Sequence, residues 1–196
     1  MAWCSSVLIM VKNNVIARIK TTWEVIKTDS VKLMKRAMVF IDGANVFHSC
    51  KNFRHGYKID YVKLRDELTK DYDLIRVYYY SGVDPSDVPS RSFHKALKAQ
   101  GFHVETRPLV ERNGKLAEKG IDVMLTTELL THAFKDNFDV AVIVGGDQDY
   151  IVALREVKRE GKRIVVACFR NSFSNEIQEI ADESVFIDNI AERVEK

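Results

Sequence analysis

From about residue 36 onward, the chain alternates between short apolar runs and segments in which apolar side chains recur every three or four residues. Short apolar runs bounded by turn residues predict buried strands, whereas the longer period predicts amphipathic helices. The predicted strands cover 37–42, 74–80, 102–106, 139–144, 163–168 and 185–187. The predicted helices cover 60–68, 89–100, 118–135, 149–160, 176–181 and the C-terminal residues. This alternation predicts a doubly wound α/β fold, with a parallel sheet and right-handed crossovers.

Residues 1–35 do not share this pattern and are predicted to form an N-terminal basic extension to a domain spanning 36–196. The extension contains six Lys or Arg residues and two acidic residues, whereas the whole chain has a formal net charge of only +2. Val15, Ile19 and Ile26 fall on one helical stripe, which would need a partner surface. A basic segment can contact RNA or a membrane surface, and a solvated tail explains the same composition.

The composition is that of a globular protein. Of its 196 residues, 46% are hydrophobic, which is enough for a core and argues against disorder. Cys4, Cys50 and Cys168 are far apart and form no CxxC pair, so neither a zinc site nor a disulfide framework is indicated. The apolar run 6–11 is too short to span a bilayer and lacks the pattern of a signal peptide. We therefore expect a soluble cytoplasmic protein with no membrane partner.

Acidic residues follow two of the predicted strands. Asp42 closes the first strand, and Asn45 follows it within one turn. Asp147 and Asp149 follow the fourth strand after a pair of glycines. The carboxyl ends of parallel strands form the usual ligand crevice of such folds, so these side chains are expected to meet there. Each acid can instead be a turn residue or a helix cap, although one cap would be enough at the second position.

Asp122 lies near the start of the predicted helix 118–135, one turn after Glu118. Like charges at i and i+4 weaken a helix, and Lys119 offsets that repulsion. An exposed acidic turn is common at a helix start, so Asp122 alone does not indicate a functional site. It becomes a candidate because the other aspartates are expected at the same crevice. Just before this helix, Asn113-Gly114 predicts a tight turn, because this pair accepts positive φ angles.

Carboxylates gathered at one crevice repel one another unless a cation joins them. Mg²⁺ and Mn²⁺ prefer oxygen ligands and retain several waters. A bound ion of this kind neutralises phosphate and activates water, so no Ser or Cys nucleophile is required. The chain has no GxxxxGK[ST], GxGxxG or HExxH motif.

At these positions the chain resembles the NYN domain family, specifically its LabA-like branch within the PIN-like nuclease group. The resemblance is carried by FIDGAN at 40–45, EKGIDV at 118–123 and VGGDQDY at 144–150. A closing segment with a serine and acids, at 174–182, also matches. The similarity extends over roughly 36–190 in the right order.

The resemblance implies a three-layer Rossmann-like (PIN-like) parallel sheet flanked by helices, and metal-dependent ribonuclease activity that uses Mg²⁺ or Mn²⁺. The implied catalytic and metal-binding acids are Asp42, Asp122, Asp147 and Asp149. The implied substrate-binding residues are Asn45, Lys119 and Ser174. Gly145 departs from the family pattern, in which serine is frequent, and this departure removes no metal ligand.

The expected substrate is RNA, in single-stranded form, since its bases can splay out and stack. Aromatic residues that could stack are Phe47, Tyr150 and Phe173, each of which could equally pack in the core. Candidate phosphate contacts are Arg54, His55, Arg91, Lys95, Arg107, Arg112, Lys115 and Arg170. The oligomeric state stays open, a homodimer included.

Two other functions fit part of the pattern. A non-catalytic RNA-binding or regulatory module could keep the acids as a structural cation site. A small-molecule phosphohydrolase of the haloacid-dehalogenase type would need an Asp-x-Asp pair at 42–44, and position 44 is Ala. The leading hypothesis is therefore a metal-dependent endoribonuclease.

Overall fold

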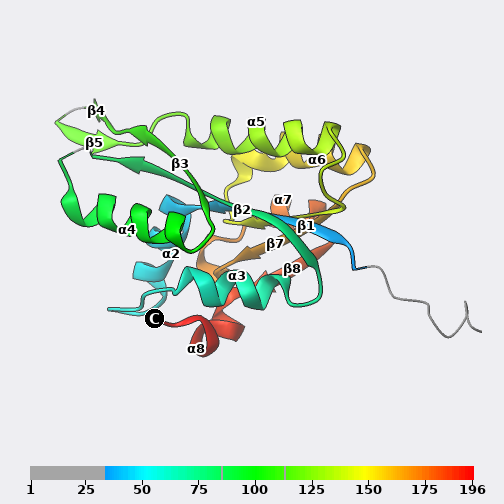
Figure 1. The fold of residues 1–196 in the computed structure, drawn as a ribbon, viewed down its shortest axis with the longest axis horizontal. Coiled ribbons are helices and arrows are strands. Elements are labelled where there is room, and N and C mark those ends of the chain that lie inside the picture. The colour runs from blue at the N-terminus through cyan, green and yellow to red at the C-terminus, as the bar shows by residue number, and fades with distance from the viewer. Residues whose placement is uncertain (1–33, 85, 113) are drawn as a thin grey trace, which may run out of the picture. The chain divides into compact units, whose positions relative to one another are not determined.

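The computed structural model describes residues 34–84, 86–112 and 114–196, so all but the last two residues of the predicted extension lie outside it. The described part contains a six-stranded sheet in the order β3-β2-β1-β6-β7-β8, with every neighbouring pair parallel (Figure 1). Its strands are β1 (Arg36–Asp42), β2 (Asp73–Val83), β3 (His103–Pro108), β6 (Val140–Val144), β7 (Arg163–Cys168) and β8 (Glu183–Phe186). Each predicted strand overlaps one of these, which confirms the α/β fold class.

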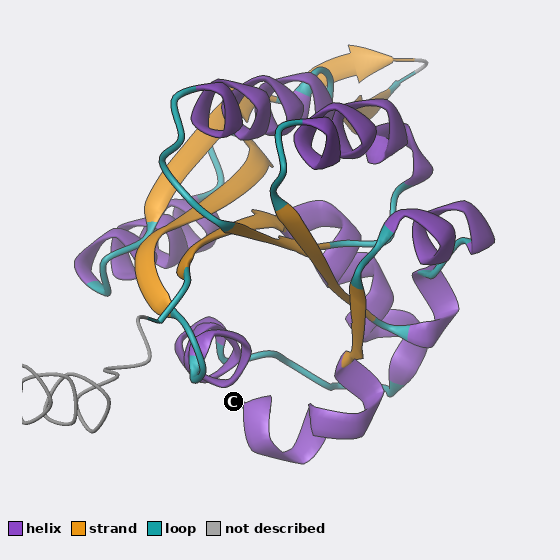
Figure 2. Ribbon diagram, turned by 90° about the vertical axis from the view of Figure 1, so that its right-hand side faces the viewer, coloured by secondary structure: helices purple, strands orange, loops and turns teal. Residues whose placement is uncertain are grey.

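Helices cover both faces of this sheet and produce three layers (Figure 2). One face carries α2 (Gly43–Phe53), α3 (Tyr61–Thr69), α4 (Val88–Ala99) and α8 (Ala191–Val194). The other carries α5 (Ile121–Phe134), α6 (Ile151–Arg159) and α7 (Asn175–Ile180). Because successive strand residues point to opposite faces, Val39 of β1 enters the first core and Phe40 enters the second. None of the helices in the described ranges is long and apolar enough to cross a membrane.

The strand order creates a crevice in the middle of the sheet. The chain builds outward from β1 through β2 to β3, and then returns to β6 on the other side of β1. Such a reversal is a topological switch point, where the carboxyl ends of two neighbouring strands diverge into their loops. β1 and β6 pair in register up to Ile41 and Val144, so Asp42 and the loop after Val144 emerge side by side.

The hydrophobic pattern does not predict α2. Its apolar side chains on the core side, Val46, Cys50 and Phe53, form a single narrow stripe separated by polar residues. The helix starts directly after β1 because the Asp42 side chain caps it, accepting a hydrogen bond from the backbone N–H of Asn45 at 3.0 Å. A strand thus passes into a helix with no intervening loop, and this turns the first residues of α2 toward the crevice.

The helix predicted over 118–135 begins later, at Ile121. Gly120 precedes it with a φ of 73°, a left-handed conformation that glycine adopts without Cβ strain. Glu118 therefore lies outside the helix, and the predicted i, i+4 repulsion between Glu118 and Asp122 is wrong.

A small hairpin lies outside the main sheet. β4 (Val110–Arg112) and β5 (Lys115–Ala117) pair in antiparallel fashion, with Arg112 opposite Lys115. The tight turn predicted at Asn113-Gly114 falls between them, and Gly114 has a φ of 73°.

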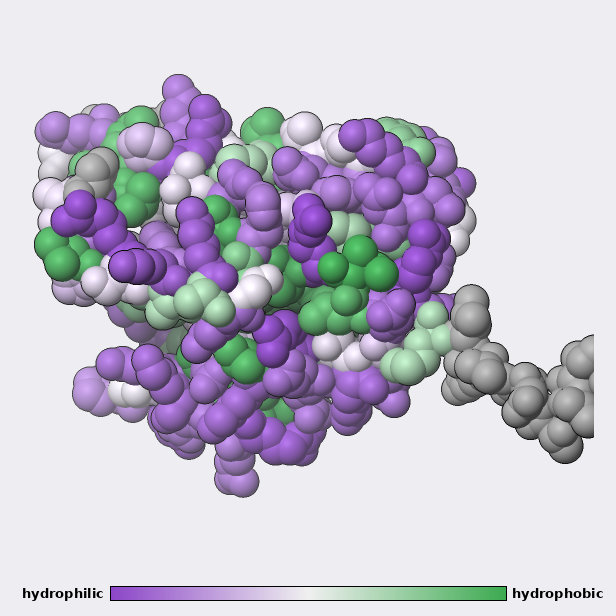
Figure 3. Space-filling model, viewed as in Figure 1, coloured by the Kyte–Doolittle hydropathy of each residue, from purple (hydrophilic) through white to green (hydrophobic). Residues whose placement is uncertain are grey.

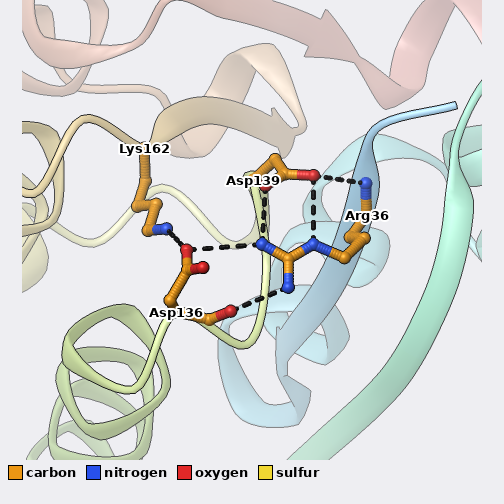
Figure 4. A network of polar contacts seen from close by, with 4 residues as sticks. All are labelled: Arg36, Asp136, Asp139 and Lys162. Atoms are coloured by element: carbon orange, nitrogen blue, oxygen red, sulfur yellow. Dashed lines mark hydrogen bonds and ion pairs between the residues drawn. The ribbon is translucent and has the colours of Figure 1, made fainter. Parts of the chain in front are cut away.

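A polar network joins the starts of β1, β6 and β7, at the edge of the sheet opposite the switch point (Figure 4). The Arg36 guanidinium donates to Asp139 Oδ1 at 2.8 Å, and the Arg36 backbone N–H donates to Asp139 Oδ2 at 2.8 Å. Arg36 also donates to the carbonyl oxygen of Asp136 at 2.8 Å, and Lys162 pairs with the Asp136 carboxylate. The hydrogen bond from Arg36 holds the pKa of Asp139 below its usual range. These charges are paired and serve the fold.

Candidate functional site

Asp42 stands at the end of β1 with only 8% of its surface exposed. Its Oδ1 accepts the capping hydrogen bond from the Asn45 backbone, and its Oδ2 accepts a hydrogen bond from the hydroxyl of Tyr150. Burial raises the pKa of Asp42 because the charged form loses water, and the negative charge of Asp147 raises it further. The two hydrogen bonds lower this pKa in part. An ionised Asp42 is therefore strained electrostatically, and a nearby positive charge would relieve that strain.

Asn45 connects the start of α2 to the loop after β6. Its Oδ1 accepts a hydrogen bond from the backbone N–H of Gly146 at 3.2 Å. Gly145 has a φ of 149°, which side-chain-bearing residues rarely adopt, and a Cβ added there would lie 3.4 Å from the Asp42 Cβ. A Cβ added at Gly146 would overlap the carbonyl oxygen of Ser172. The paired glycines thus let the loop pass close to both α2 and the segment after β7.

Asp147 and Asp149 differ in position although they are two residues apart. Asp147 is half-buried and caps the short 3-10 helix Gln148–Tyr150, with its Oδ1 accepting from the Asp149 backbone N–H at 3.0 Å. The side chain of Asp149 is exposed, and the next residue, Tyr150, is fully buried beneath the site. The 3-10 turn therefore directs Asp147 inward and Asp149 outward.

Glu118 and Asp122 flank the start of α5. Glu118 accepts a hydrogen bond from the backbone N–H of Gly82, at the end of β2. Its pKa is raised, first by burial and then by the charge of Asp42, while His48 opposes the rise. Asp122, in the first turn of the helix, is half-buried. Sequence reasoning treated Glu118 as a helix neighbour of Asp122 and missed its position in the site.

These elements surround a cavity of about 400 Å³ at the switch point. Its acidic lining residues are Asp42, Glu118, Asp122 and Asp147. Its other polar lining residues are Asn45, His48, Ser49, Asn52, Asn171 and Ser172. The Asn171 side chain donates to the backbone carbonyl of Ser49 at 3.2 Å, which fixes the segment after β7 against α2. The cavity thus combines acidic side chains with hydrogen-bonding groups from two segments, α2 and the residues after β7.

Comparison with known proteins agrees with this geometry. The family described as the NYN domain matches residues 36–188. The chain belongs to the NYN domain family. Domains of this family are typically nucleases, and the matched region contains every acidic residue that lines the cavity.

Relatives extend over most of this NYN domain. The low amplitude and bright protein LabA of Synechococcus elongatus is 25% identical over 174 residues, covering 82% of this chain and 88% of that protein. The uncharacterized protein MJ0482 of Methanocaldococcus jannaschii is 28% identical over 147 residues, covering 75% of this chain and 53% of its own length. A crystal structure of VPA0982 from Vibrio parahaemolyticus, a protein of unknown function, has a TM-score of 0.72 at 22% identity, covering 84% of this chain and 98% of that one. This last similarity supports the fold.

The NYN domain brings three of the four predicted aspartates to the cavity wall, namely Asp42, Asp122 and Asp147, together with Asn45. Asp149 faces solvent and does not line this cavity. Of the other predicted substrate-binding residues, Lys119 is exposed. Ser174 caps α7, its Oγ accepting from the Ile177 backbone N–H at 3.2 Å. The functional roles of all these residues remain predictions, those at the cavity included.

Most donor groups at the cavity are carboxylate, amide and hydroxyl oxygens, with the imidazole of His48 beside them, and oxygen donors suit Mg²⁺ or Mn²⁺ better than a soft metal. Within the described residues, no group of three or more His, Cys, Asp or Glu side chains is close enough to hold one ion. Mg²⁺ is commonly bound through one or two carboxylates with several waters retained, and an open cavity leaves room for such a hydrated ion. The residues present therefore fit a hydrated divalent cation and do not fit a closed carboxylate cage.

Several predicted RNA contacts already have partners within the NYN domain. Arg54 pairs with Glu195 at 2.5 Å, and Arg170 lies 4.0 Å from the ring centroid of Phe186. Arg107 is exposed, and its guanidinium lies beside Gly120 at the start of α5. Arg107 is thus a candidate phosphate contact that lies next to the cavity rim.

Proposed function

We propose that this NYN domain is a metal-dependent endoribonuclease that cleaves phosphodiester bonds in single-stranded RNA. The observation that carries the proposal is the meeting of Asp42, Asp122 and Asp147 at one cavity, on the switch point of the sheet. These residues come from three distant parts of the chain. Their assembly in a nuclease family favours chemistry at this position over three independent structural roles.

Asp42 and Asp147 are the residues that would hold a divalent cation, and Asp122 lines the same cavity. When bound, the cation supplies positive charge for the scissile phosphate and lowers the pKa of a coordinated water. The raised pKa of Asp42, caused by burial and by the charge of Asp147, supports this assignment, because neither carboxylate forms an ion pair within the described part of the chain. Asn45 and the hydroxyl of Tyr150 hold the Asp42 carboxylate in one orientation.

The remaining groups have roles in binding and orientation. Asp147 and Asp149 are proposed to orient the attacking water from the rim of the cavity. The amides of Asn52 and Asn171 can donate to the ribose or to base edges, while Arg107 and Lys119 can contact phosphates. We further propose that the protein acts in the cytoplasm.

A second candidate function is an RNA-binding module without catalysis. The observation that favours it is the lack of a preformed group of three metal-binding side chains in the described part of the chain. Such a module would bind RNA with its acidic cavity occupied by a structural cation or by protonated carboxylates.

The test compares cleavage of a 5′-labelled unstructured RNA in Mn²⁺, in Mg²⁺ and in EDTA. The first proposal predicts cleavage with metal, none in EDTA, and loss of cleavage in Asp42→Asn and in Asp147→Asn. Asp66→Asn is the matched control, because this exposed acid on α3 does not line the cavity. Asparagine at 42 can still accept from the Asn45 backbone, so both variants should remain folded. Full activity in either site variant refutes the mechanism, and RNA binding without cleavage supports the module.

A further inference from the structure

Phe47 is an exposed aromatic residue on the helix that forms one wall of the cavity. It has 54% of its surface exposed, so its ring is accessible from solvent. The other two aromatic candidates are not accessible to a base in this way. Tyr150 is fully buried, and Phe173 packs edge-on against Phe186 with ring centroids 5.1 Å apart.

The helical geometry of α2 relates Phe47 to the cavity. Ala44, His48 and Asn52 line the cavity at i, i+4 and i+8, so they form one row along the helix. Phe47 lies three residues after Ala44 and directly before His48, on the neighbouring row. The Phe47 and His48 rings are 5.8 Å apart and meet at 67°. Phe47 therefore borders the cavity wall without entering the cavity.

A cation accompanies this ring. The Lys51 ammonium lies 4.3 Å from the centroid of Phe47, one helical turn further along the same row. Proteins commonly bind single-stranded nucleic acid through aromatic side chains, which stack on the bases, and basic side chains, which contact the phosphates. Phe47 and Lys51 provide one group of each kind. The surface seen in Figure 3 is largely hydrophilic, with hydrophobic groups scattered over it, so exposure alone does not select Phe47. We select Phe47 because it borders the cavity and because its ring lies next to the Lys51 ammonium.

We infer that Phe47 stacks against a base of single-stranded RNA next to the nucleotide in the cavity, while Lys51 contacts the phosphate of that base. This inference rests on the proposed ribonuclease function and specifies how its substrate is selected. Bases in a duplex are already paired and stacked on one another, so a duplex base would have to be unpaired before it could stack on the Phe47 ring. The contact therefore favours unstructured RNA over duplex RNA, and it discriminates little among the four bases.

The test measures binding of a fluorescein-labelled unstructured RNA by anisotropy, in the Asp147→Asn background with Ca²⁺ in place of Mn²⁺. Phe47→Ala should raise the Kd about 5- to 160-fold, the range for loss of one aromatic–base stack, whereas Phe47→Trp should retain affinity. Phe134→Ala is the matched control, since Phe134 is 61% exposed at the far end of α5 from the cavity-lining Asp122. Lys51→Ala should reduce the salt dependence of binding by about 0.7 in log–log slope.

RNAs that each carry a single abasic site separate stacking from a structural role. One abasic position should weaken binding to the parent protein, and Phe47→Ala should add no further loss on that RNA. Equal affinity of Phe47→Ala and Phe134→Ala for unstructured RNA overturns the inference, as does an equal loss for duplex RNA. If the wild-type chain cleaves RNA and either result is found, the ribonuclease proposal survives and the stacking inference fails. If the wild-type chain neither binds nor cleaves RNA, both fail.

Discussion

The hydroxyl of Tyr150 is buried and donates to the Asp42 carboxylate, so Tyr150→Phe removes one hydrogen bond and leaves the ring in place. Burial raises the pKa of Tyr150, which keeps the hydroxyl protonated and able to donate. A hydrogen bond to a charged group contributes about 1.5–3 kcal/mol, and its loss should lower Tm by about 3–12 °C in a domain of this size. RNA cleavage should also decrease, because Asp42 loses its fixed orientation and part of its ionised population.

The effect should depend on pH in a defined direction. Burial already raises the folded-state pKa of Asp42 above its ordinary value, and the Tyr150 hydrogen bond lowers it in part. Tyr150→Phe therefore raises it further. A carboxyl group with a raised folded pKa contributes stability below its unfolded pKa, and this contribution is lost as the pH rises through the folded pKa. The loss of stability in Tyr150→Phe should thus be small at acidic pH, where Asp42 is protonated in both proteins, and should increase as the pH rises and that carboxyl ionises.

Tyr57→Phe provides the matched control. Tyr57 is also buried, and its hydroxyl donates to a neutral acceptor, the Ala191 backbone carbonyl, at 2.9 Å. Its loss should amount to about 0.5–1.5 kcal/mol with no change over the same pH range. The measurement is urea unfolding of the wild type and both variants at each pH. If the two variants lose the same stability with no pH dependence, Tyr150 does not bond an ionised Asp42 and the electrostatic account of the site is refuted.

Three further outcomes are expected. Mn²⁺ at a hundredfold excess over its Kd should stabilise the wild type by about 2.7 kcal/mol in thermal scans and Asp147→Asn much less; an equal shift would exclude Asp147 as a ligand. Gly146→Ala should destabilise the fold by about 3 kcal/mol or more, since the new Cβ overlaps the carbonyl oxygen of Ser172; an unchanged Tm would contradict the close packing of this loop. Arg36→Ala should lower Tm at neutral pH and less so in acid. The Arg36 hydrogen bond lowers the pKa of Asp139, so this pair stabilises the fold only while that carboxyl is ionised. A loss of Tm that does not depend on pH would argue against the ion pair.

The sequence was sufficient to predict the strands and to predict that Asp42 and Asp147 lie at the same crevice. Buried parallel strands consist of continuous apolar runs, and an acid that closes such a run must emerge at the carboxyl edge of the sheet. Since both runs lie at the centre of the sheet, the two acids meet whatever their side-chain rotamers. The periodicity that predicts α5 likewise placed Asp122 at the correct end of that helix, because α5 starts at the carboxyl edge of the sheet, beside the residues that follow β1 and β6, and runs away from that edge.

Contacts between distant residues decided the rest. Gly120 adopts a left-handed conformation immediately before α5, so the helix starts after Glu118. Glu118 instead accepts a hydrogen bond from the backbone N–H of Gly82 and lies in the site. Periodicity reports only residues a few positions apart and cannot detect a bond across 36 residues. The apolar stripe of α2 is too narrow for periodicity to predict a helix there. The helix nevertheless starts directly after β1, because the Asp42 side chain caps it.

The sequence by itself determined which residues could carry the chemistry: aspartates at strand ends, glycines beside them and aromatic residues nearby. Only the tertiary structure decided their accessibility. Asp147 faces the cavity and Asp149 faces solvent because of the 3-10 turn that begins between them. Phe47 is exposed because other residues of α2 face the core, whereas Tyr150 is buried because it packs with residues of α5 and α6 in the second core. Residue type sets what a side chain can do, whereas packing against non-local neighbours sets whether water, an ion or RNA can reach it.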